Sequence, residues 1–226
     1  MAVESVGRHL RFPRQERSRA RTALLLDAAS ALMHTRPFDQ IAVAEIARRA
    51  GTSVGGFYAR FPTKEALLHV IDARIVADCL AAFDWALSDR VMANATVAEV
   101  VTAYTRVMVT KFREHHATLV QILRAAKSGD PDWAARTAAF NAHVHSRLRV
   151  LLEARRNQIR HENPSLAINL GLAFTSAAAR EVMLANSLRV YPVRVDDERL
   201  IVELARMWMR YLGADWTSDP TGEPPC

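Results

Sequence analysis

The sequence predicts an all-α protein. Apolar residues recur at spacings of three and four along most of the 226 residues, which is the period of an amphipathic helix. Several helix starts are marked: Thr96 and Glu99 form a capping box, while Asp130-Pro131 and Asn163-Pro164 each place a capping side chain before a proline. No run has the apolar–polar alternation typical of a half-buried strand.

The predicted elements fall into four segments. We expect a disordered basic arm at 1–13, a three-helix head at 14–62, a larger helical domain at 63–213 and a disordered tail at 214–226. In the head, helices are expected at about 14–34, 43–50 and 53–60. A long helix at about 64–87, capped by Thr63, joins the head to the rest, and further helices are expected at about 97–114, 116–127, 131–157, 164–187 and 197–213.

Charge separates the head from the rest of the chain. Residues 1–70 hold 11 Lys and Arg against 6 Asp and Glu, a net charge of +5, whereas the whole chain has a net charge of +6. A basic domain beside a nearly neutral one suits a polyanionic partner for the first domain. No uncharged apolar run reaches the ~18 residues of a membrane span, and the first residues do not read as a signal peptide. We therefore expect a soluble, cytoplasmic protein without membrane partners.

Residues 43–60 predict two short helices joined by a tight turn. The first, 43–50, has apolar and charged residues on opposite sides. Gly51 then stands where helices commonly end in the left-handed conformation, and Thr52 or Ser53 can cap the second helix.

The second helix contains two glycines. Gly55 and Gly56 lie inside it, although glycine costs about 1 kcal/mol relative to alanine in a helix interior. A missing side chain is useful where a backbone must approach another surface closely. A helix, a glycine turn and a slim second helix are typical of a helix-turn-helix, whose second helix lies in a DNA major groove.

A longer motif surrounds this pair of helices. Its members are Ile46-Ala47, Ala50-Gly51, Ser53, Gly55, Phe57-Tyr58, Phe61 and Lys64-Glu65-Ala66-Leu67. As a set they resemble the tetracycline-repressor (TetR) family of bacterial transcriptional regulators, whose pattern reads IA..AG.S.G..Y..F..KE.L. The motif covers roughly the first third of the chain. Beyond it, the resemblance implies a helical domain for ligand binding and dimerisation.

One position departs from the family pattern. Ala42 stands where the family usually has a threonine that caps the first short helix and touches phosphate. We expect Asp39 or Gln40 to provide the cap instead.

The predicted DNA-binding residues surround the second short helix. Thr52 and Ser53 can reach bases or phosphate, and Val54 can touch a thymine methyl group. Basic side chains of the arm and first helix can lie in a minor groove, or alternatively form a solubilising tail. The full set is Arg14, Arg17, Arg48, Thr52, Ser53, Val54, Gly55, Gly56, Tyr58, Arg60 and Lys64, of which Tyr58, Arg60 and Lys64 are expected on backbone phosphates.

The last two helices predict an association surface. Apolar residues with few charges follow one face of each, and an isolated helix-turn-helix reads too little DNA for useful specificity. The alternative is an ordinary monomer core. In the TetR-like family these two helices form a four-helix dimer interface, and the candidate residues are Leu170, Ala173, Ala177, Leu184, Leu204, Met207, Trp208 and Tyr211.

Bulky side chains in the middle helices are candidates for an effector pocket. Each one alone fits an ordinary core, and the resemblance implies that together they line a cavity for a small apolar or aromatic effector. They are Phe83, Tyr104, Met108, Phe112, Ile122, Trp133, Phe140 and Phe174, with Asn141 and His143 as polar contacts.

The sequence gives little support for a catalytic or metal-binding site. Gly51 and Gly56 match the ends of a phosphate-binding loop, but Phe57 stands where that loop needs lysine. His143 and His145 are two apart and do not share a helix face, and Cys79 and Cys226 make no ligand pattern. We therefore expect no enzyme activity, no metal and no cofactor.

The function predicted from the sequence is a ligand-responsive DNA-binding transcriptional regulator. It would most simply be a repressor that binds a near-palindromic operator as a homodimer and is released by a small molecule. The alternatives are a small-molecule-binding enzyme and a helical protein–protein adaptor.

Overall fold

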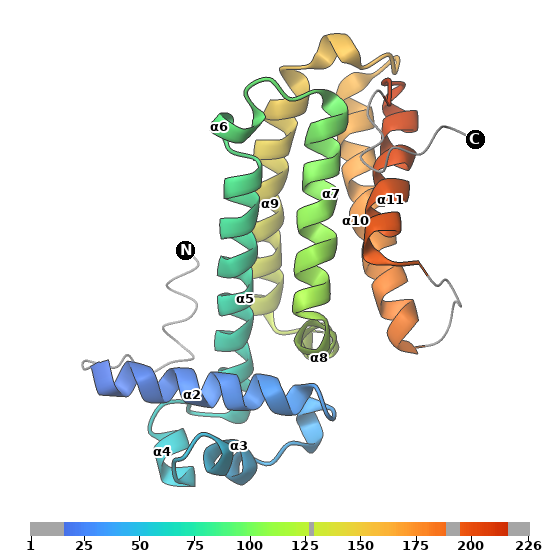
Figure 1. Ribbon diagram of the computed structural model, residues 1–226. Coiled ribbons are helices and arrows are strands. Elements are labelled where there is room, and N and C mark those ends of the chain that lie inside the picture. Colours follow the sequence, from blue (N-terminus) through green and yellow to red (C-terminus); the bar gives the residue numbers. More distant parts are fainter. Residues whose placement is uncertain (1–15, 127–128, 189–194, 217–226) are drawn as a thin grey trace. The chain divides into compact units, whose positions relative to one another are not determined.

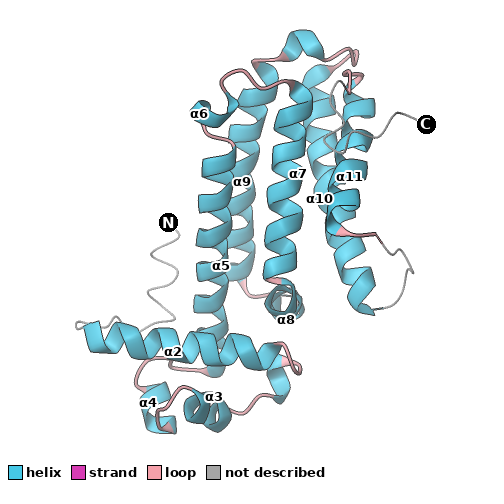
Figure 2. Ribbon diagram, in the orientation of Figure 1, coloured by secondary structure: helices cyan, strands magenta, loops and turns pink. Residues whose placement is uncertain are grey.

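The computed structural model describes residues 16–126, 129–188 and 195–216 of the chain, and all its regular elements in these ranges are helices (Figures 1 and 2). No helix among these residues is long and apolar enough to cross a membrane. The all-α prediction is confirmed for the described part of the chain.

The helices follow the predicted order closely. The N-terminal part contains α2 (Glu16–Met33), α3 (Val43–Arg49), α4 (Val54–Tyr58) and the long α5 (Lys64–Ala86), with a 3₁₀ turn, η1 (Phe38–Gln40), before α3. After these come α6 (Asp89–Met92), α7 (Val97–Glu114), α8 (His116–Ala126), α9 (Pro131–Glu153), η2 (Arg156–Gln158), α10 (Pro164–Leu188) and α11 (Asp197–Leu212).

Local capping explains most of these starts. Thr96 and Glu99 form the predicted capping box: Glu99 N–H donates to Thr96 Oγ1 at 3.2 Å, and Thr96 N–H donates to Glu99 Oε2 at 2.7 Å. The hydrogen bonds that the Glu99 carboxylate accepts from the Thr96 N–H and hydroxyl lower its pKa. The side chains of Thr63, Asn163 and Asp196 likewise accept from the first turns of α5, α10 and α11. Gly213 ends α11 in the left-handed conformation, with φ of 63°.

Three boundaries differ from the sequence prediction. The N-cap of α3 is Ala42, which makes no side-chain cap bond, so the expected cap by Asp39 or Gln40 is wrong: residues 38–40 are already taken up by η1. Helix α9 ends at Glu153 rather than near 157 and is followed by η2. The short α6 was not predicted.

The chain divides into two compact units, Met1–Asp78 with His115–Phe140, and Cys79–Glu114 with Asn141–Cys226. Two of the boundaries between these units fall inside long helices, α5 and α9. The functional segmentation proposed from the sequence stays a prediction.

The first unit is built on the packing of α2, α3 and α4. In Figure 1, α3 lies against α2 and α4 lies against α3, and α2 also contacts α8. Fully buried side chains at the centre include Leu25, Ile46 and Phe57. Phe57 also contacts the rings of Tyr58 and Phe61, at centroid distances of 5.3 and 5.5 Å. The short helices are thus held by tertiary packing, since neither is long enough to be stable alone.

The second unit is built on α7, α10 and α11, which lie side by side (Figure 1). Trp208 of α11 is fully buried and lies directly on α10 at Gly171, where a Cβ atom would stand 1.8 Å from the indole nitrogen. Tyr104 of α7 closes the other side, with its ring 5.9 Å from that of Trp208. Gly171 is therefore required by close helix packing.

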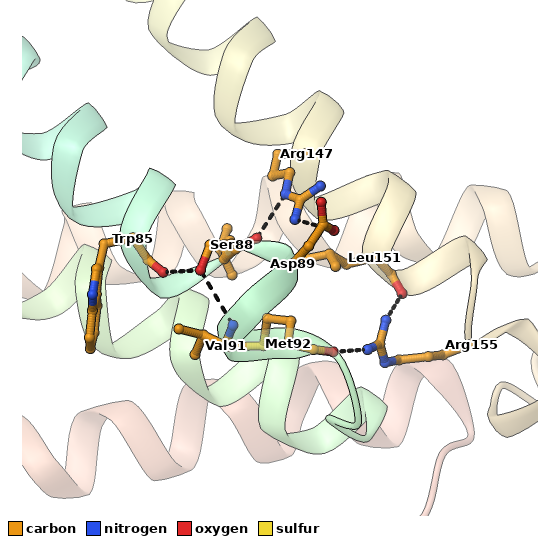
Figure 3. A network of polar contacts seen from close by, with 9 residues as sticks. Trp85, Ser88, Asp89, Val91, Met92, Arg147, Leu151 and Arg155 are labelled. Atoms are coloured by element: carbon orange, nitrogen blue, oxygen red, sulfur yellow. Dashed lines mark hydrogen bonds and ion pairs between the residues drawn. The ribbon is translucent and has the colours of Figure 1, made fainter.

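Two arginines of α9 and the turn after it hold the corner around α6 (Figure 3). Arg147 Nε donates to Leu87 O at 2.7 Å, and its Nη2 donates to Asp89 Oδ1 at 2.8 Å. Arg155 donates to the carbonyl groups of Ala95 and Met92. The corner between α5 and α7 is thus stabilised by side chains that follow it by about 60 residues.

Candidate nucleic-acid interface

Helix α4, the second helix of the helix-turn-helix, is packed against its own chain on one side and exposed on the other. Ser53 caps it by accepting the Gly56 N–H at 3.0 Å, and Phe57 is fully buried. Val54 and Tyr58 are 42% and 45% exposed, and Ser53 and Gly55 are also exposed. The helix therefore presents the predicted contact residues to its surroundings and is not buried against its own protein.

The two glycines of α4 differ in what surrounds them. A Cβ atom at Gly55 would have only Ser53 Oγ nearby, at 3.8 Å, which is ordinary van der Waals contact. A Cβ atom at Gly56 would stand 2.3 Å from Thr52 Oγ1. Packing within the chain thus accounts for Gly56, whereas nothing in the described structure accounts for a glycine at 55.

The two arginines near α4 differ in how far the chain itself engages them. Arg60 donates from Nη1 to Gly56 O at 2.8 Å, and its Nε is buried without a hydrogen-bond partner in the described structure. Arg48 is exposed at the end of α3. Arg60 is therefore partly used in holding the C-terminal end of α4, while Arg48 is open to solvent.

Lys64 begins α5 and is engaged within the chain. Its ammonium donates to Asp39 O at 3.1 Å and lies 4.6 Å from the centre of the Phe38 ring. Burial lowers the pKa of Lys64, and the carboxylates of Glu65 and Asp39 partly oppose that shift. A role in phosphate binding requires the ammonium to share or exchange this carbonyl. Arg14 lies outside the described residues, as does the side chain of Arg17.

The comparisons with known proteins agree with this geometry. Residues 25–71, which span most of α2 through the first turns of α5, match the family model described as bacterial regulatory proteins, tetR family. Residues 25–71 therefore form a DNA-binding domain of the TetR family. The chain is accordingly a DNA-binding transcriptional regulator.

Solved structures show the same fold over most of the chain. The TetR family regulator PfmR from Thermus thermophilus has a TM-score of 0.63 at 20% identity, covering 82% of this chain and 97% of that chain. SmeT, the repressor of the Stenotrophomonas maltophilia multidrug efflux pump SmeDEF, has a TM-score of 0.62 at 20% identity, covering 90% and 95%. A regulator in the tetR family from Rhodococcus has a TM-score of 0.66 at 18% identity, covering 86% and 98%. No curated protein sequence matches the chain.

The outer face of α10 and α11 is apolar. Phe174 and Met207 are 62% and 63% exposed there, and Ala173 and Ala177 are exposed beside them. A groove of about 440 Å³ between the helices is lined by Gly171, Phe174, Thr175, Ala178, Leu204, Met207, Trp208 and Tyr211.

The structure sorts the predicted association residues into two groups. Leu204 and Trp208 are buried by their own chain, so the sequence prediction is corrected for them: they form the floor of the groove and belong to the subunit core. Leu170 and Tyr211 are half-buried, whereas the side chain of Leu184 lies outside the described residues. Periodicity marked one broad apolar face, and packing against α10 divided it into inner and outer residues.

The predicted effector-pocket residues do not form one group. Ile122, Trp133 and Phe140 belong to the first compact unit, whereas Phe83, Tyr104, Met108, Phe112, Asn141, His143 and Phe174 belong to the second. Phe174 lies on the outer face just described, which corrects its assignment to an interior pocket.

Within the second unit, two of these residues form part of the core. Phe83 and Tyr104 are buried with ring centres 5.5 Å apart. The Ser176 hydroxyl donates to Leu172 O, so its oxygen is left to accept the Tyr104 O–H at 2.8 Å, and burial raises the pKa of Tyr104 to about 12. Asn141 and His143 are exposed, and His143 Nε2 lies 2.6 Å from Asp84 Oδ1. The two polar residues therefore lie at the surface and line no interior cavity.

Proposed function

We propose that this TetR-family regulator is a repressor that binds a near-palindromic operator as a homodimer and is released by a small-molecule effector. Each subunit would insert α4 into a major groove, with half-sites about one helical turn (~34–36 Å) or a multiple of it apart. Repression as the outcome is supported by the likeness to SmeT, which is itself a repressor of an efflux pump.

The observation that carries the DNA-binding mode is the open space at Gly55. The protein itself leaves room for a side chain there, and glycine in a helix costs about 1 kcal/mol relative to alanine. A surface that must approach the α4 backbone closely explains both facts. Duplex DNA against Ser53, Val54 and Tyr58 is such a surface, and the exposed Arg48 suits its phosphates.

Dimerisation through α10 and α11 is supported by the apolar outer face. Phe174 and Met207 are large apolar side chains more than half exposed on adjacent helices. Exposed apolar groups gathered in one place mark association sites more often than scattered single residues do. A second copy presenting the same face would bury both sets.

Salt-dependent binding to DNA from the protein's own upstream region tests the first part of the proposal. Lys64→Ala should weaken binding to all DNA sequences and reduce the slope of log affinity against log salt by about 1, with little change in base preference. Arg90→Ala, on the exposed surface of α6, is the matched loss of one cation and should leave both quantities unchanged. An unchanged affinity and slope in Lys64→Ala would mean that the lysine serves only its contact with Asp39.

Light scattering on variants of the outer face tests the second part. Met207→Glu should convert the dimer to a folded monomer and lower operator affinity, because the residue is exposed within the chain. Val150→Glu introduces the same charge at another exposed apolar residue, on α9, and should leave the dimer intact. A Met207→Glu protein that stays dimeric would place the interface elsewhere. Small molecules that release DNA from the dimer would then identify the effector.

A further inference from the structure

Helix α3 begins without a side-chain cap and is held by an ion pair close to its start. The N-cap residue is Ala42, whose side chain makes no hydrogen bond. Glu45 stands at the third position of the helix, where the glutamate of a capping box bonds back to the N-cap N–H. In this chain its carboxylate contacts Nη2 of Arg36. The side chains of Glu45 and Arg36 are 25% and 38% exposed, so the pair is partly buried.

The arginine of this pair projects from a well-held part of the backbone. Leu32 O, near the end of α2, accepts hydrogen bonds from the N–H groups of Thr35 and Arg36 at 2.9 and 3.3 Å. The Thr35 hydroxyl donates to the same oxygen at 2.8 Å. Beyond Arg36, the Phe38 N–H donates to Gln121 Oε1 of α8 at 3.3 Å. The backbone on both sides of Arg36 is thus tied to α2 and to α8.

Apolar packing by itself defines the orientation of α3 only weakly. The helix lies against α2 (Figure 1) and buries Ile46 and Ala47 completely. Hydrophobic burial is non-directional, and a helix as short as α3 is not stable alone. A hydrogen-bonded pair of a guanidinium and a carboxylate is directional. The contact between Arg36 and Glu45 therefore fixes the start of α3 relative to the end of α2.

Arg36 depends on Glu45 for the compensation of its charge. Arg36 Nε is buried and has no hydrogen-bond partner in the described part of the chain, and the carboxylate in contact with this guanidinium is that of Glu45. Removing one partner of a partly buried pair leaves the other charge desolvated, which costs more than the intact pair contributes. Loss of Glu45 should therefore let Arg36 and the start of α3 move apart, so that the arginine can reach water.

The turn after α3 passes the position of that helix to α4. Thr52 N–H donates to Ala47 O at 2.9 Å, so the turn is bonded to the end of α3. Ser53, the N-cap of α4, follows immediately. A displacement at the start of α3 therefore changes the direction in which α4 presents its exposed side.

We propose that Arg36 and Glu45 are positioning residues for DNA binding: their ion pair holds α3, and through it α4, in the arrangement that binds DNA. Neither side chain has to touch DNA in this role. A protein that occupies its binding arrangement only part of the time binds with an affinity reduced by that fraction. Loss of the pair should weaken binding by about threefold to tenfold. The link from α4 to DNA affinity rests on the proposed function, whereas the anchoring of α3 does not.

Variants that keep the net charge separate this role from simple attraction to phosphate. Arg36→Gln with Glu45→Gln removes the pair, and Arg36→Glu with Glu45→Arg reverses it. Fluorescence anisotropy on duplex DNA from the protein's own upstream region should show the full loss for the neutral pair and recovery to within about twofold for the reversed pair. Asp27→Asn with Arg74→Gln removes an exposed pair between α2 and α5 in the same way and should leave affinity unchanged.

The single change Glu45→Gln has an outcome of decisive sign. Removing a carboxylate that acts only through its charge strengthens binding to DNA, whereas loss of the anchor weakens it. In the free protein, amide hydrogen exchange at 43–49 should be faster in the neutral pair and unchanged in α11. Tighter binding by Glu45→Gln, a neutral pair that binds like the natural chain, a reversed pair no better than the neutral one, or unchanged exchange in α3 would each overturn the proposal. Failure of the natural chain to bind the duplex would refute the proposed function instead, and exchange in α3 then decides whether the pair anchors the helix.

Discussion

Replacing Gly55 by alanine should change the stability of the free protein and its affinity for DNA in opposite directions. The new methyl group would lie 3.8 Å from its nearest neighbour, Ser53 Oγ, so it meets no steric obstacle in the chain. Alanine is favoured over glycine inside a helix by about 1 kcal/mol. Gly55→Ala should therefore raise the melting temperature by about 2–4 °C, as expected for a domain of 150–250 residues.

The same methyl group should weaken DNA binding. It would project beside the exposed Val54 and Tyr58, from the face that we place in the major groove. Inserting a group of that size into a closely packed contact typically costs about 1–3 kcal/mol, which corresponds to a loss of affinity of about 5- to 150-fold. Fluorescence anisotropy with operator DNA measures this loss, and scanning calorimetry on the free protein measures the gain in stability.

Gly56→Ala provides the contrast. Its methyl group would stand 2.3 Å from Thr52 Oγ1, so Thr52 must move and the stability gain should be smaller or absent. The reasoning is refuted if Gly55→Ala binds operator DNA as tightly as the natural chain, because α4 would then not approach DNA by this face. A fall in the melting temperature would instead refute the claim that the site is open.

Three further predictions concern stability. Gly171→Ala would place a methyl group 1.8 Å from the Trp208 indole nitrogen. Thermal unfolding should therefore show that the free energy of unfolding falls by about 1–3 kcal/mol or more. An unchanged melting temperature would mean that the indole has room to move. Arg155→Met removes the hydrogen bonds to two carbonyl groups of the corner around α6. It should lower the free energy of unfolding in urea by about 1–3 kcal/mol and speed amide exchange in that corner. Equal exchange rates would show that the corner is stable without this arginine. Because hydrogen bonds from Thr96 lower the pKa of Glu99, its carboxylate stabilises the fold above the ordinary glutamate pKa of about 4.3 and this contribution is lost as pH falls through the lowered value. The melting temperature of Glu99→Gln should therefore lie below that of the natural chain at pH 7 and converge with it at a pH below the lowered pKa, and a difference independent of pH would contradict this reading.

The helix-turn-helix was predictable because its signals are local. The Gly51 turn and the Ser53 cap lie within a few residues of one another, and the structure has each in the expected role. The same holds for the capping box at Thr96, where donor and acceptor are three residues apart.

The contacts of the buried His69 could not be predicted in this way. His69 meets Asp130 and Arg136 across more than 60 residues of sequence, and nothing in the spacing of these residue types indicates the contact. Lys64 shows the same limit, because the motif marked it as a phosphate contact while its bond to Asp39 O arises from tertiary packing.

Most helix positions, most of their caps and the family of the head were determined by the sequence alone, because periodicity and capping act between residues a few positions apart. The tertiary structure decided which apolar residues serve the core and which remain available to a partner. Met207 and Trp208 are adjacent in the chain, yet one is 63% exposed and the other 2%. The reason is the missing side chain of Gly171 on the neighbouring helix, which admits the indole of Trp208 and leaves Met207 outside.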